Sequence, residues 1–101
     1  MKNDKNKLPY ADVLTRQFPN AIQKLVELSA MAHTRLGDRD NDFRNFTRLY
    51  NAENRMANAL MRHAVQGNKA SDDFKGVNHI TQVAFNALAL IEILIEKNEL
   101  K

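Results

Sequence analysis

Apolar residues recur at helical spacing along most of the chain, and no segment shows the strict alternation typical of a strand. The pattern predicts a short helix over 9–17 and a longer helix over 19–36, each opened by a proline. A third helix is expected over about 45–66 and a last helix over about 76–97. Glycines directly follow the second and third helices, where they favour a C-terminal stop. The sequence therefore predicts an all-α fold, a small helical-hairpin bundle of about four helices.

The last helix is apolar on nearly every side, which sets it apart from the others. Such a helix needs cover on two sides in a domain of this size, and the simplest cover is another copy of itself. We therefore expect a homodimer or a higher homo-oligomer. The main stripe of this helix comprises Ile80, Val83, Ala84, Ala87, Leu88, Ile91, Leu94 and Ile95. The expected buried face of the third helix comprises Phe46, Leu49, Tyr50, Ala57, Leu60, Met61 and Ala64.

Length and composition narrow the class of protein. The 101 residues suit one helical domain over 8–101, preceded by a Lys/Asn-rich tail over 1–7 that we expect to be disordered. The chain has no cysteine and no apolar leader, so we expect a cytoplasmic protein, in the host cytoplasm if it is viral. The apolar run 83–95 is too short and too polar to predict a membrane span. A net charge of +3 favours a small anionic partner over duplex nucleic acid.

Arginines form a regular row on the predicted third helix. Arg48, Arg55 and Arg62 are spaced seven apart, and the polar residues around them on that face include no acid. Guanidinium groups bind phosphate oxygens two at a time, so this row is a candidate site for an anionic ligand. The simpler interpretation is a solvated helix face.

Two histidines flank the turn between the third and last helices. His63 closes one helix and His79 opens the next, and Gln82 and Asn86 share a face with His79. The imidazoles are candidates for a divalent metal site with Asp72 or Asp73, or for phosphate binding with Arg62. A purely structural role is the alternative. The ligand-binding candidates are Arg48, Arg55, Arg62, His63, Lys69, His79, Gln82 and Asn86.

Other polar residues are open to more than one interpretation. Glu53 falls inside the apolar stripe of the third helix, where a carboxylate requires a partner or a metal. The acidic stretch 38–42 resembles the start of a calcium loop, but Phe43 occupies the glycine position and Leu49 the closing glutamate position, so we reject it. His33 is expected to be structural.

The segment 59–92 contains a series of short motifs, which are Arg62-His63, Gly67-Asn68, Asp72-Asp73, Gly76, His79, Gln82 and Asn86-Ala87-Leu88. With these motifs the segment resembles the N-terminal domain of the phage dATP/dGTP diphosphohydrolase family. The resemblance implies a phage protein that handles purine nucleotides. Relatives of this family cleave between the α- and β-phosphates, with magnesium, and release the nucleoside monophosphate and pyrophosphate. Asn68 and Gln82 replace a glutamate and a histidine of the family pattern, and Lys69 and Lys75 make the loop basic.

Three functions follow from these observations. The first is a nucleotide-binding sponge that needs no cofactor and sequesters a nucleotide or a nucleotide-derived immune signal, an anti-defence role. The second is a magnesium-dependent pyrophosphohydrolase that uses Glu53, Asp72, Asp73 and His79, with Asp72, Asp73 and Glu53 as metal ligands. The third is a helical adaptor that docks on another protein through its apolar last helix. Depletion of acids around the arginine row favours the first.

Overall fold

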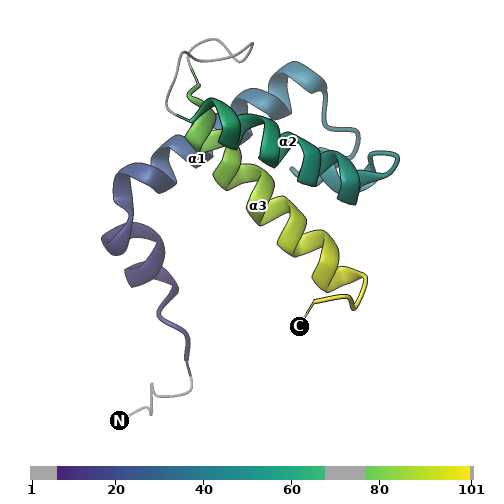
Figure 1. Ribbon diagram of the computed structural model, residues 1–101. Helices are drawn as coiled ribbons and strands as arrows, with labels where there is room; N and C mark the ends of the chain where they lie inside the picture. Colours follow the sequence, from purple (N-terminus) through teal and green to yellow (C-terminus); the bar gives the residue numbers. More distant parts are fainter. Residues whose placement is uncertain (1–6, 68–76, 101) are drawn as a thin grey trace.

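The computed structural model describes residues 7–67 and 77–100, and these residues form helices connected by loops (Figure 1). The elements are the π-helix η2 (Asp12–Gln17), α1 (Pro19–Leu36), the 3₁₀-helix η3 (Asn45–Arg48), α2 (Ala52–Gln66) and α3 (His79–Glu96). No strand occurs within the described residues, so the predicted all-α fold is confirmed. The tail expected to be disordered lies, except for Lys7, outside the described residues.

An antiparallel hairpin of α2 and α3 forms the centre of the fold (Figure 1). Met56 of α2 packs against Ala89 and Ile93 of α3, and apolar side chains from η3 and the helices surround this cluster. Helix α1 contacts α3, and its Leu28 is the most deeply buried residue of α1. Because the hairpin is antiparallel, the end of α2 lies beside the start of α3.

The helix ends follow the signals in the sequence. Pro19 opens α1, and Gly37, with a φ of 71°, follows its last residue. At Gly67, with a φ of 61°, the backbone N–H donates to the carbonyl oxygens of His63 and Ala64 and closes α2. The side chain of Asn78 caps α3, its Oδ1 accepting a hydrogen bond from the Thr81 N–H at 2.8 Å.

The predicted third helix, 45–66, is wrong as a single element. The chain leaves η3 at Leu49, which is extended, and Asn51 adopts a left-handed conformation with a φ of 56° before α2 starts. Asparagine tolerates this conformation better than most residues, so the break has a local cause. Tyr50, expected to be buried, is 88% exposed at this corner, and Met61 is also exposed. The break removes Arg48 from the helical register of Arg55 and Arg62.

Helix α3 is oriented opposite to the expectation from its apolar stripe. Its buried residues are His79, Gln82, Asn86, Ala89 and Ile93, whereas Ile80, Leu88, Ile91 and Ile95 are exposed. Polar side chains of α3 therefore face α1 and α2, and the larger apolar face is uncovered in a single chain. By length and composition α3 is the one helix in the described part that could cross a membrane.

Candidate functional site

Four buried polar side chains gather where α2 ends and α3 begins. His63, His79, Gln82 and Asn86 are each between 5% and 7% exposed. The Nδ1 atoms of His63 and His79 lie 2.8 Å apart, within hydrogen-bond distance. One of these nitrogens must donate and the other accept, so at least one imidazole is neutral with its proton on Nε2. The two histidines therefore connect the helices through a directional, protonation-dependent contact.

A cavity of about 340 Å³ lies beside this cluster, between the C-terminal half of α1, the following loop, η3 and the α2–α3 hairpin. Most of its lining is apolar, with residues such as Leu28, Phe46 and Met56. Its polar lining includes His33, Asp38, Arg62, His63, Gln82 and Asn86. A mostly apolar hollow with a few converging polar groups is the usual form of a small-molecule site.

Arg62 supplies a cation to this cavity. It lines the cavity on the last turns of α2 and is exposed. Within residues 7–67 and 77–100, neither Arg62 nor Arg55 is paired with a carboxylate. Arg55, almost two turns earlier, does not line the cavity. The two residues are therefore similar in charge and helix context but different in position.

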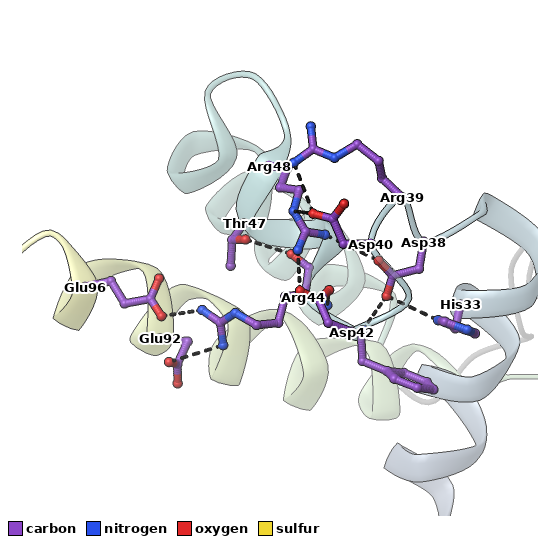
Figure 2. Close-up of polar contacts among 11 residues, drawn as sticks. His33, Asp38, Arg39, Asp40, Asp42, Arg44, Thr47, Arg48, Glu92 and Glu96 are labelled. Carbon is purple, nitrogen blue, oxygen red and sulfur yellow. Dashed lines mark hydrogen bonds and ion pairs between the residues drawn. The ribbon is translucent and has the colours of Figure 1, made fainter.

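The loop between α1 and η3 is organised around the Asp38 carboxylate (Figure 2). This side chain is 2% exposed, and it accepts hydrogen bonds from His33 Nδ1 at 3.2 Å, from the Phe43 N–H and from Arg48 Nη1 at 3.3 Å. Because a carboxylate only accepts, the proton of this contact lies on His33 Nδ1. Asp38 thereby fixes the end of α1, the loop backbone and η3 together.

Arg48 does not belong to an acid-free row of arginines, and this part of the prediction is wrong. Its guanidinium contacts Asp38, Asp40 and Asp42, with 3.1 Å between Nε and the Asp40 carboxylate (Figure 2). The hydrogen bond from Arg48 holds the pKa of Asp42 below its usual value, and the same bond raises the pKa of Arg48. The three aspartates of the acidic stretch rejected as a calcium loop thus all pair with one arginine of the same chain.

Glu53 lies at the opposite end of the hairpin from His79. Its carboxylate accepts a hydrogen bond from Lys97 Nζ at 3.1 Å, and that bond raises the pKa of Lys97. Nearby, Arg44 pairs with Glu92 and Glu96 of α3 (Figure 2). Glu53 is therefore a member of a surface ion pair and does not form one site with His79, contrary to the enzyme hypothesis.

The described residues include no group of three or more His, Cys, Asp or Glu side chains suited to a metal ion. Asp72, Asp73 and Lys69 lie outside the described residues. Of the candidates, Arg62, His63, Gln82 and Asn86 line one cavity, and His79 contacts His63 from behind it. Arg48 and Arg55 do not line it.

Sequence reasoning missed the contribution of α1 and the loop that follows it. His33 stacks on Phe43, with 4.0 Å between the ring centroids and 14° between the ring planes, and both residues line the cavity. Phe43 itself could have indicated this contribution, because it is a large aromatic residue in an otherwise polar loop, where no core position is expected.

The family sequence profile described as dATP/dGTP diphosphohydrolase, N-terminal, matches residues 1–101. The chain belongs to this family. The resemblance found over 59–92 is thereby confirmed and extends over the whole chain. No curated protein and no solved structure gives a significant match. Membership of the dATP/dGTP diphosphohydrolase N-terminal family relates the chain to nucleotide handling.

Proposed function

We propose that this protein binds a nucleotide, or a small molecule derived from one, in the cavity and holds it without turnover. The observation that carries the proposal is the composition of the cavity wall. Arg62 supplies an unpaired cation among the described residues, and Gln82 and Asn86 supply amides on an otherwise apolar lining. A volume of about 340 Å³ falls within the range of small-molecule pockets.

Each group has a distinct role in binding. The Arg62 guanidinium donates to phosphate oxygens in pairs, which gives both charge neutralisation and a fixed orientation. The amides of Gln82 and Asn86 offer donors and acceptors to the edge of a base or to a sugar hydroxyl. Apolar lining from α1, η3 and α2 excludes water and strengthens these hydrogen bonds.

Carboxylate chemistry favours binding over hydrolysis. Magnesium-assisted cleavage of a phosphate chain requires several carboxylates that converge on the metal. Among the described residues, Asp38 is the one carboxylate that lines the cavity, and it is engaged by His33, Arg48 and the loop backbone. The described residues thus do not fit a magnesium site.

A magnesium-dependent pyrophosphohydrolase is the second candidate, and family membership is the observation that favours it. Incubation of the chain with a panel of nucleoside triphosphates and cyclic nucleotides, with and without magnesium, separates the two functions. After denaturation and chromatography, a binder returns its ligand intact, and binding does not depend on magnesium. Release of monophosphate and pyrophosphate would establish the enzyme instead.

Arg62→Ala is expected to weaken nucleotide binding by about 10- to 150-fold, because it removes a charge-assisted contact to phosphate. Isothermal titration calorimetry with the nucleotide recovered from the panel measures this change. Arg55→Ala is the matched control, since it removes the same charge from the same helix outside the cavity. Equal losses in the two variants would show that only net charge matters and would reject the site.

The uncovered apolar face of α3 supports assembly with further copies, in keeping with a sponge of host immune nucleotides in the cytoplasm. Leu88→Glu, on the exposed side of α3, is expected to reduce the molar mass measured by light scattering to that of one chain. Tyr50→Glu, also at an exposed residue but outside α3, should leave the mass unchanged. A wild-type protein that is monomeric at all concentrations would instead favour the adaptor function.

A further inference from the structure

Phe43 combines three properties that a loop residue rarely has together. It lines the cavity, it is 55% exposed, and its ring stacks on the His33 ring in a nearly parallel arrangement. A parallel stack covers one face of a ring. With more than half of the residue exposed, the opposite face is available to another planar group.

The backbone at Phe43 is held in an unfavourable conformation. Its φ of 62° lies in the left-handed region, which is uncommon for bulky residues and costs free energy. Asn41 in the same loop has a similar φ of 56°, but asparagine adopts this conformation readily. Residues strained in this way persist where contacts with the surrounding structure hold the backbone in place, and they cluster at ligand sites.

One carboxylate fixes both rings of the stack. Asp38 accepts the Nδ1–H of His33 and the backbone N–H of Phe43. It therefore sets the position of the His33 ring and of the backbone that carries the Phe43 ring. Arg48 in turn holds Asp38 from the side of η3. The aromatic pair is therefore preorganised, which lowers the entropy that a ligand would lose on stacking.

We propose that Phe43, supported by His33, is a stacking platform for the nucleobase of the bound ligand. This inference rests on the proposed function and specifies its ligand as a molecule with a planar base. Phe43 and Arg62 line the same cavity from different elements, the loop after α1 and the end of α2. The base lies on Phe43 while the phosphate groups contact Arg62.

The test compares ligands with and without a base. Calorimetric titrations use dATP and dGTP on one side and inorganic tripolyphosphate on the other, because tripolyphosphate keeps the phosphates and lacks the base. Phe43→Gly should weaken nucleotide binding by about 5- to 150-fold, the range for loss of a base–aromatic stack. Binding of tripolyphosphate should change by less than about twofold, because this ligand has no base that stacks on the ring. Phe43→Tyr keeps an aromatic face and should bind both as the wild type does.

Glycine is the informative substitution because it accepts a φ of 62° without strain, so the loop backbone is retained while the ring is lost. Asn41→Gly is the matched control in the same loop and should not alter binding. If Phe43→Gly fails to fold, nuclear Overhauser effects between the Phe43 ring and the base protons of dATP in the wild-type protein provide the test.

The outcomes distinguish this inference from the proposed function. Equal dATP binding by the wild type and Phe43→Gly, or absence of those ring–base effects in a saturated complex, overturns the stacking platform alone. If Phe43→Gly weakens the binding of dATP and of tripolyphosphate equally, the stacking platform is also overturned, because the ring would then support the structure of the whole cavity. A wild-type protein that binds no nucleotide overturns the proposed function and the platform together.

Discussion

Asp38→Ala is expected to lower the free energy of unfolding by about 3 kcal/mol, because three hydrogen bonds to a charged acceptor are lost at roughly 1 kcal/mol or more each. The carboxylate is almost fully buried and connects α1, the loop and η3. Its loss leaves the Phe43 N–H and the His33 Nδ1–H without this acceptor. Urea denaturation followed by circular dichroism measures the change.

Asp40→Ala is the control for this prediction. Asp40 also contacts Arg48, but its side chain is half exposed and belongs to the surface of the loop. Exposed ion pairs contribute between zero and about 1 kcal/mol, so this variant should stay close to the wild type. Similar destabilisation by both substitutions would mean that the charge of the loop matters and that the buried hydrogen bonds of Asp38 do not.

His79→Ala is the second substitution with a large expected effect, again about 3 kcal/mol of lost stability. It removes the hydrogen bond between two buried imidazoles and leaves a void where the ring was, and both effects destabilise. Ile80→Ala is the matched control, because the next residue on the same turn is half exposed and should cost less than about 1 kcal/mol.

A double-mutant cycle isolates the contact between the imidazoles from the rest of this effect. The loss of unfolding free energy in the double variant should be about 1 kcal/mol smaller than the sum of the losses in His63→Ala and His79→Ala. The reason is that either single substitution already breaks the contact between the two rings. Strictly additive losses would indicate that the Nδ1–Nδ1 contact contributes nothing to stability.

Local signals in the sequence predicted much of the fold. Pro19, Gly37 and Gly67 act through backbone conformations that depend on a few neighbouring residues, so the start of α1 and the C-terminal ends of α1 and α2 were predictable. The sequence singled out His63 and His79 because they flank one turn, but the packing of α2 against α3 decides that their imidazoles meet. The binding roles of the cavity residues stay predictions.

Errors in the prediction arose where tertiary contacts override local patterns. The arginine row failed between Leu49 and Asn51, where an extended residue and a left-handed residue change the register between Arg48 and Arg55. Glu53 occupies the predicted apolar stripe, but its partner Lys97 is 44 residues away in sequence. Likewise, no pattern within 38–43 alone indicates that Asp38 holds Phe43 against His33. Such pairings depend on how the helices pack, which the linear pattern does not encode.

The inward polar side of α3 has a consequence for any ligand and any neighbouring molecule. Gln82 and Asn86 line the cavity, whereas Leu88 and Ile91 face outward from the same eighteen-residue helix. A rotation of α3 about its helix axis would change the cavity lining and the outer apolar face together. Binding at the two sites is then coupled. By thermodynamic reciprocity, if a neighbour on the outer side strengthens ligand binding, the ligand strengthens binding of that neighbour by the same free energy.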